Sequence, residues 1–339
     1  MSAAALRLAR RGSGLASVTF AGLAFLAGCH PPRPPSPVTA RRPAGETMPG
    51  PTKSVLVPFT RSAFPYEGEI PEKGTPFLDV AAGGRHGHTS PRGGLYWEDE
   101  TYNDRRVLLS IPAGFRLGRP ALIVVFFHGN QSILDRDVDG RQEVPRQVEE
   151  SGLNAVLVAP QMAVDALDSS AGHFWERGMF AGFLDEAADR LAELSGQPRA
   201  RQVFRQLPVL VVAYSGGYNP AAFVLERGGA GSRVRGVLLL DALSGEIGKF
   251  ADWVTAHRTS AFFVSSYSRA TQSENAQLQG ILDRRHVPYE TALPVSIQQG
   301  VVAVFDAGPD AVHTDFVTRA WAADPLKVLL SRVSGFRRI

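Results

Sequence analysis

The sequence has one cysteine, Cys29, so a structural disulfide cannot form within one chain. It also has little net charge: the formal excess is +3, and Arg7, Arg10 and Arg11 account for it in a leading segment without acidic residues. The residues from 54 onward are slightly acidic, at about −3. This lack of basic charge argues against a nucleic-acid partner.

Long hydrophobic runs are absent near the start of the chain. The apolar run at residues 15–28 follows a purely basic stretch and is too short to span a bilayer comfortably, so it predicts an export signal. Residues 26–29 (LAGC) resemble the lipobox of bacterial lipoproteins, which implies that Cys29 is acylated and becomes the mature N-terminus. The alternative is a plain secretory signal cleaved nearby.

Residues 30–53 are rich in proline and poor in large apolar side chains, so they cannot bury a core and should form an extended tether. We therefore expect a signal segment at 1–29, a tether at 30–53 and a single folded domain at 54–339. The implied location is the bacterial cell envelope, with a lipid anchor at Cys29. His30, rather than an aspartate, follows the cysteine, which implies the outer membrane.

Short β-rich apolar runs alternate with helix-patterned stretches after residue 54. Their hydrophobicity is continuous rather than alternating, which indicates strands buried on both faces of a parallel sheet. The fold class expected is α/β, a mostly parallel central sheet flanked by helices. The predicted strands lie within residues 105–112, 121–129, 154–160, 207–215, 234–241, 260–268 and 300–306.

Two helices and one loop are predicted between or after these strands. Residues 183–194 have helical spacing, and residues 313–333 suggest a terminal helix interrupted at Pro325. The glycine-rich residues 80–94 predict a loop. Its His86 and His88 are expected to be solvated rather than metal ligands, because no acidic or cysteine partner lies near in sequence.

Polar residues close several of the predicted strands, notably His128, Ser215 and Asp241, and His313 follows the last one. In an open α/β sheet, ligands gather beyond the carboxyl ends of the strands. The turn after residue 214 has neither the G-x-G-x-x-G frame nor a P-loop lysine, so a phosphate-binding loop is disfavoured.

The motif A-x-S-x-G at residues 213–217 stands where α/β-hydrolases carry their G-x-S-x-G nucleophile elbow, and His128-Gly129-Asn130 stands where their oxyanion-side strand ends. Over about residues 95–330 the chain resembles this family, in particular its esterase-like members. Ala213 replaces the usual first glycine and is still small enough for the sharp turn.

The resemblance implies a nucleophile at Ser215, a base at His313 and an acid at Asp241, in the chain order of the family. Most members carry the acid one strand later, where this sequence offers no carboxylate at the strand end. Glu246 and Glu274 therefore remain alternative acids. His128 is expected to be a structural member of its turn.

The resemblance also implies an oxyanion hole made by backbone N–H groups of Gly216 and of Asn130 or Gln131. We expect Tyr214, Phe174 and Trp175 to contact substrate, although Phe174 and Trp175 fit packing beneath their loop equally well. Residues 135–146 match the first half of a calcium loop, but Arg146 occupies the position of its bidentate glutamate, so no metal site is expected.

The function implied is that of an envelope serine hydrolase acting on a small-molecule or envelope ester through an acyl-enzyme at Ser215, without a cofactor. The alternative is a catalytically inactive lipoprotein of the same fold that binds a glycan or a protein partner, because fold alone does not dictate activity.

Overall fold

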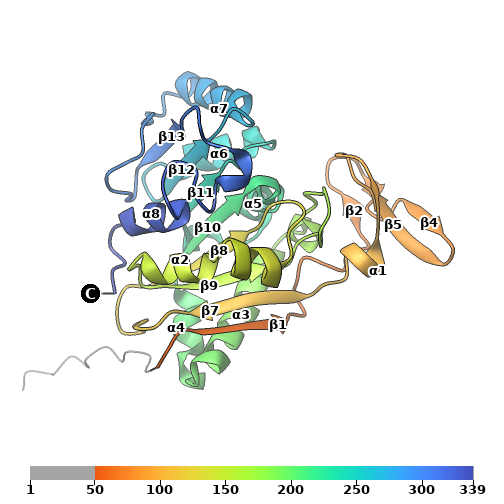
Figure 1. Ribbon diagram of the computed structural model, residues 1–339, viewed down its shortest axis with the longest axis horizontal. Coiled ribbons are helices and arrows are strands. Elements are labelled where there is room, and N and C mark those ends of the chain that lie inside the picture. Colours follow the sequence, from red (N-terminus) through yellow and green to blue (C-terminus); the bar gives the residue numbers. More distant parts are fainter. Residues whose placement is uncertain (1–49, 339) are drawn as a thin grey trace, which may run out of the picture. The chain divides into compact units, whose positions relative to one another are not determined.

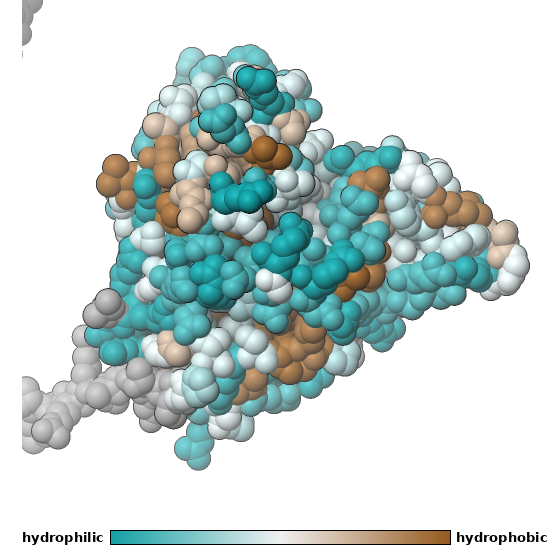
Figure 2. All heavy atoms as spheres, in the orientation of Figure 1, coloured by the Kyte–Doolittle hydropathy of each residue, from teal (hydrophilic) through white to brown (hydrophobic). Residues whose placement is uncertain are grey.

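The computed structural model describes residues 50–338. The predicted signal segment, Cys29 and the tether up to residue 49 lie outside the described residues. The first strand, β1, begins at Lys53, next to the predicted start of the domain. Among residues 50–338, no helix is both long and apolar enough to cross a membrane. Hydrophilic side chains predominate on the face drawn in Figure 2, and hydrophobic ones form separate groups there.

An eight-stranded sheet forms the centre of the described fold (Figure 1). The six strands β9, β8, β10, β11, β12 and β13, in this order across the sheet, are parallel to their neighbours. Strand β7 is antiparallel to both of its neighbours, β1 and β9. The predicted fold class, a mostly parallel sheet flanked by helices, is thereby confirmed. Across the sheet the order is β1 (Lys53–Pro58), β7 (Arg106–Ile111), β9 (Ala155–Pro160), β8 (Leu122–Phe127), β10 (Val209–Tyr214), β11 (Val234–Leu240), β12 (Phe262–Tyr267) and β13 (Val302–Asp306).

The central strands are buried on both faces, which explains their unbroken hydrophobicity. Every residue of β8 is buried, and alternate side chains enter two different cores. Helices α3 to α7 pack against one face, and α2 and α8 against the other. The helices are α1 (Glu98–Thr101), α2 (Val144–Glu150), α3 (Met179–Ser195), α4 (Arg201–Gln206), α5 (Tyr218–Arg227), α6 (Ile247–His257), α7 (Gln272–Arg284) and α8 (Pro325–Arg332).

The connection between β1 and β7, residues 59–105, carries two small antiparallel sheets beside the large one (Figure 1). We call it the arm. One of its sheets corrects the predicted loop at 80–94. Gly83 and Gly84, both at positive φ, join two short strands there. The strands of the arm are β2 (Glu69–Ile70), β3 (Thr75–Pro76), β4 (Val80–Ala82), β5 (Arg85–Thr89) and β6 (Leu95–Trp97).

His88 lies on β5 and is buried, so the prediction of a solvated loop histidine was wrong for this residue. Its Nδ1 contacts the Phe77 carbonyl oxygen at 2.7 Å, and its ring stacks on the Phe77 ring. Phe77 also contacts Tyr102 and Trp175 edge to face. His88 is therefore part of an aromatic cluster at the base of the arm. His86, on the same strand, is exposed.

The predicted terminal helix at 313–333 was also wrong in extent. His313–Asp315 forms only a short 3-10 turn, and the α-helix runs from Pro325 to Arg332. Pro325 is thus the first residue of α8 and not an interruption, because a proline at the first helical position loses no intrahelical hydrogen bond. Residues 316–324 are not helical, and His313 lies in the connection between β13 and α8.

Candidate active site

Ser215 lies at a sharp strand-to-helix turn. Strand β10 ends at Tyr214, residues Ser215–Gly217 form a 3-10 turn, and α5 begins at Tyr218. The φ angle of Ser215 is 51°, a left-handed conformation that non-glycine residues rarely adopt. Strain of this kind persists only where the surrounding structure imposes it, and it is typical of active sites.

Glycines allow this turn to pack closely. A β-carbon on Gly129 would lie 2.9 Å from the Ser215 β-carbon, and one on Gly217 would collide with the Phe127 carbonyl oxygen. A side chain at position 217 would therefore displace the backbone of β8, and one at position 129 would displace Ser215 or the Tyr214 ring. The turn thus has the geometry expected of a nucleophile elbow.

The side chains of Ser215, His313 and Asp241 come together at the carboxyl edge of the sheet, although they are far apart in sequence. The distance from Ser215 Oγ to His313 Nε2 is 2.7 Å, and that from His313 Nδ1 to Asp241 Oδ2 is 2.6 Å. The carboxylate can only accept, so Nδ1 carries a proton and donates it. Nε2 of the neutral imidazole is then left to accept from the serine hydroxyl.

Asp241 follows β11, is fully buried, and is surrounded by donors from the loop after β12. Ser268 donates through its backbone N–H and its hydroxyl, at 2.9 and 2.6 Å, and the Thr271 hydroxyl donates as well. Burial alone would raise the pKa of Asp241, but the hydrogen bonds from His313, Ser268 and Thr271 outweigh it and lower the pKa below its usual range. Asp241 is therefore ionised at neutral pH.

Neither of the two alternative acids contacts His313. Glu246 immediately precedes α6 and pairs with Lys249 at 2.8 Å. Glu274 lies in the first turn of α7, and neither carboxylate has a hydrogen bond to His313 among residues 50–338. Asp241 is the carboxylate that contacts the imidazole. Sequence reasoning did not identify Ser268 and Thr271 as its donors, although a hydroxyl-rich strand end was visible at residues 265–271.

The lowered pKa predicts how pH changes the effect of Asp241 on stability. Unfolded, an aspartate titrates at about 3.9, and the folded value is lower. The ionised side chain thus stabilises the fold above about pH 4, and this contribution is lost as the pH falls through the folded pKa. Urea unfolding should show a gap in unfolding free energy between wild type and Asp241→Asn that is present at pH 5 and shrinks as the pH falls below about 4. A gap that widens in acid would contradict the assignment.

Tyr214 holds the other side of His313. Its hydroxyl donates to the His313 carbonyl oxygen at 3.1 Å, and the two rings stack with centroids 5.7 Å apart. Burial raises the pKa of Tyr214 to about 12, so the hydroxyl remains a donor at neutral pH. Tyr214 also lines the cavity described below, as the prediction of a substrate-contacting residue requires.

Asn130 and Gly216 face each other beside Ser215. A β-carbon on Gly216 would overlap Asn130 Oδ1, which in turn accepts from the Ser169 hydroxyl at 3.0 Å. No hydrogen bond among the described residues engages the backbone N–H of Asn130 or of Gly216. Gln131 differs, because its N–H donates to the Ala166 carbonyl oxygen at 2.8 Å. The predicted role of the Gln131 N–H in an oxyanion hole is therefore not supported. The N–H groups of Asn130 and Gly216 remain as candidate donors.

His128 is buried beneath this turn. Its Nδ1 contacts the Gly129 carbonyl oxygen at 2.7 Å, and its Nε2 accepts from the Met162 N–H at 2.9 Å. Burial lowers the pKa of His128, so the ring is neutral. These contacts agree with the structural role predicted for it.

A cavity of about 670 Å³ opens over Ser215 and His313. Its wall includes Asn130 and, from the segment once considered as a calcium loop, Asp137 and Arg141. The first part of that segment lies in a π-helix, Leu134–Arg141, and its last residues begin α2. No cluster of potential metal ligands occurs among residues 50–338.

A second, smaller cavity of about 240 Å³ lies between the arm and α5, with Trp175 in its wall. The indole Nε1 donates to Asn219 Oδ1 at 3.1 Å. Phe174, by contrast, is fully buried and packs edge to face against Phe127 and Phe183. The prediction that Phe174 contacts substrate was wrong, because its ring fills the core beneath the loop.

No sequence-family model and no curated protein matches the chain. Among solved structures, it is similar to a feruloyl esterase module from Clostridium thermocellum complexed with sinapinate, at 12% identity over 79% of this chain and 97% of that one, with a TM-score of 0.41. An S-formylglutathione hydrolase from Agrobacterium tumefaciens is 13% identical over 75% and 97%, with a TM-score of 0.39. A thermostable esterase from Pseudomonas putida is 12% identical over 75% and 82%, with a TM-score of 0.39. At these levels of identity and TM-score, none of them bears on what this chain binds or hydrolyses.

Proposed function

We propose that this protein is a serine hydrolase that cleaves carboxylic esters through an acyl-enzyme at Ser215. The observation that carries the proposal is the chain of hydrogen bonds from Ser215 through His313 to the buried carboxylate of Asp241. A serine hydroxyl is a poor nucleophile at neutral pH unless a base takes its proton, and here the base is within hydrogen-bond distance.

In the first half-reaction, Ser215 Oγ attacks the ester carbonyl carbon while His313 Nε2 accepts the hydroxyl proton. Asp241 accepts from Nδ1 and so favours the imidazolium that forms. The tetrahedral intermediate then collapses, the bond to the leaving-group oxygen breaks, and Nε2–H protonates that oxygen. The acyl group stays on Ser215 as an ester.

The oxyanion of the intermediate is stabilised by the backbone N–H groups of Asn130 and Gly216. They lie on opposite sides of the Ser215 turn, one after β8 and one in the turn that follows β10. Gly216 lies at the start of a helical turn, where N–H groups lack an intrahelical acceptor. One such donor contributes about 3 kcal/mol of transition-state stabilisation.

Deacylation repeats these steps with water as the nucleophile. His313 Nε2 takes a proton from water, hydroxide adds to the acyl carbon, and the same N–H groups hold the second oxyanion. Collapse releases the carboxylic acid, and the proton returns from Nε2 to Ser215 Oγ. No residue beyond the three side chains and the two backbone groups is needed for the proton balance.

An inactive glycan-binding or protein-binding lipoprotein is not favoured. Such a protein would have no need to keep Ser215 in a strained conformation or to surround a buried carboxylate with donors. The lipid anchor at Cys29 and the envelope location remain part of the proposal.

A fluorophosphonate probe tests the nucleophile. We expect the wild type to gain one covalent adduct, on Ser215 in peptide mass spectrometry, because the probe captures an activated serine. The Ser215→Ala variant should gain none. A matched control is Ser273→Ala, which removes an exposed serine on α7 and should label like the wild type. Labelling of Ser215→Ala, or none of a folded wild type, would refute the proposal.

A further inference from the structure

The charged side chains that line the cavity over Ser215 are mostly basic. Its wall contains the guanidinium groups of Arg92, Arg136 and Arg141 but one carboxylate, Asp137. The described part of the chain is otherwise slightly acidic. Positive charge is therefore concentrated where a substrate would enter.

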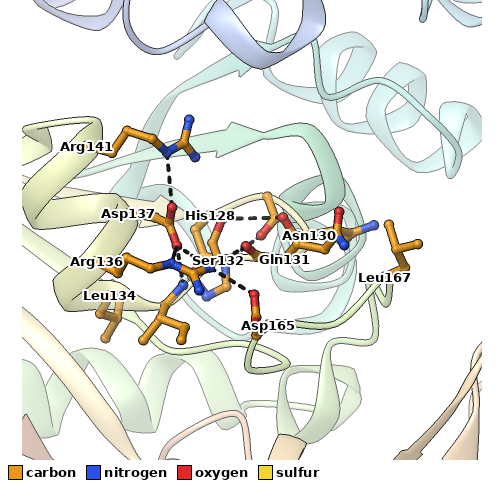
Figure 3. A network of polar contacts seen from close by, with 12 residues as sticks. His128, Asn130, Gln131, Ser132, Leu134, Arg136, Asp137, Arg141, Asp165 and Leu167 are labelled. Carbon is orange, nitrogen blue, oxygen red and sulfur yellow. Dashed lines mark hydrogen bonds and ion pairs between the residues drawn. The ribbon is translucent and has the colours of Figure 1, made fainter.

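Arg136 and Asp137 largely satisfy each other. Arg136 Nε donates to Asp137 at 2.8 Å, and its Nη2 donates to Asp165 at 2.8 Å and to the Gln131 carbonyl oxygen at 2.9 Å (Figure 3). Asp137 also accepts from the Ile133 N–H at 2.9 Å. This network holds the turn behind Asn130 and engages Nε and Nη2 of Arg136, so that only Nη1 has no partner among residues 50–338.

Arg141 is different. Only its Nε is engaged, with Asp137 Oδ1 at 3.0 Å, and its two terminal nitrogens have no partner among residues 50–338 (Figure 3). The side chain is 49% exposed and lines the same cavity as Ser215 and His313. The bond at Nε ties the guanidinium to Asp137 and leaves both terminal nitrogens available to donate to a ligand.

Arg92 lies between the two cavities and lines both. It is at the exposed tip of the β5–β6 hairpin of the arm, close enough to Tyr218 that the two side chains interact. No acidic side chain forms an ion pair with it within the described ranges. Its charge therefore adds to that of Arg141 at the mouth of the site.

We propose that the ester substrate carries an anionic group, a carboxylate or a phosphate, which the free edge of Arg141 binds while Ser215 attacks the ester, with Arg92 adding attraction from the arm. This inference rests on the proposed function and names the substrate class of the same site. A guanidinium edge recognises both anions through two parallel N–H···O bonds. A neutral ester of the same length would leave those donors unused.

Two matched ester pairs test the inference, one for each side of the scissile bond. The first pair is para-nitrophenyl hexanoate and mono-para-nitrophenyl adipate, which differ by a carboxylate at the end of an acyl chain of equal length. The second is methyl para-acetoxybenzoate and para-acetoxybenzoate, in which the carboxylate is on the leaving group. The wild type should show a higher kcat/KM for the anionic member of at least one pair, and high salt should reduce the difference.

Substitutions of the arginines test which residue binds the anionic group. Arg141→Gln should lower the ratio of anionic to neutral kcat/KM about tenfold, as expected for the loss of a charge-assisted hydrogen bond. Arg141→Lys should lose less, because the charge remains. Arg92→Gln should have a smaller effect that disappears at high salt. Arg190→Gln is the matched control, since Arg190 lies on α3, pairs with Glu193 and lines neither cavity.

The two anion sources are separated by inhibition of neutral-ester hydrolysis. Stronger inhibition by inorganic phosphate than by acetate would identify a phosphate as the anionic group, and stronger inhibition by acetate would identify a carboxylate. In Arg141→Gln, the inhibition by either anion must be weaker than in the wild type. An enzyme that labels at Ser215 and hydrolyses the neutral esters without preferring either anion, or whose preference survives both arginine variants, would overturn this inference alone. Absence of both labelling and hydrolysis would overturn the proposed function and the inference with it.

Discussion

Replacing His313 by alanine is expected to lower kcat for an aryl ester by about a millionfold, because serine then has no base and the leaving group no acid. The melting temperature should change little. His313 is partly exposed, at 36%, and Asp241 keeps its hydrogen bonds to Ser268 when the imidazole is removed. Initial-rate kinetics and a thermal scan of the same preparation give both values.

The matched control is His86→Ala, which removes an exposed histidine on β5 and should leave the rate unchanged. If His313→Ala kept more than a small fraction of activity, the 2.7 Å contact with Ser215 would not be catalytic. If it unfolded the protein instead, His313 would be a structural residue.

Asp241→Asn is expected to lower kcat by about 10,000-fold with a smaller change in KM. An asparagine amide oriented toward His313 would donate to Nδ1 and force the proton onto Nε2, which could then no longer accept from Ser215. The fold should survive, because Ser268 and Thr271 retain a partner at position 241. The rate measured from pH 6 to pH 9 should stay low throughout, since added hydroxide does not restore the tautomer.

Glu246→Gln is the control for the identity of the acid. Glu246 pairs with Lys249 and not with His313, so this variant should keep its kcat within about twofold. If Glu246→Gln lost most of its activity while Asp241→Asn kept nearly normal activity, the acid would be Glu246 and not Asp241.

The central sheet could be predicted because its strands are buried on both faces. Runs such as residues 122–127 and 209–214 have no polar positions, a pattern that few other arrangements produce. The same reasoning indicated where polar residues end these strands. The sequence therefore predicts Ser215, Asp241 and His313 as candidates, whereas the hydrogen bonds between them depend on the folded chain.

Local patterns were less informative where tertiary contacts decide the structure. The glycines at 83–84 that suggested a loop instead form the tight turn of a hairpin, a signal that is readable when the flanking residues are taken as strands. At residues 313–324, apolar residues have helical spacing, yet Phe316 and Val317 are buried in the second core by a non-helical chain. Packing of these side chains outweighs helix propensity there.

The surroundings of Asp241, the proposed acid, could not be predicted from sequence spacing. Asp241 directly follows β11, one strand before the position at which most members of the family that the sequence resembles carry their acid, and Ser268 and Thr271 follow β12. Their hydroxyls donate to Asp241, so the later loop contributes donors in place of a carboxylate. Only the parallel pairing of β11 with β12 brings the two loops into contact.

The arm has a consequence for how such a protein can diversify. Pro58, at the end of β1, pairs with Arg106, at the start of β7. The arm, residues 59–105, therefore begins and ends at neighbouring positions of the sheet. Lengthening or exchanging the hairpin tips would cost little chain entropy, since loop closure depends weakly on length. The aromatic residues at its base, Phe77 among them, would have to stay. New selectivity could thus arise at the tips while Ser215, His313 and Asp241, the residues proposed to cleave the ester, remain unchanged.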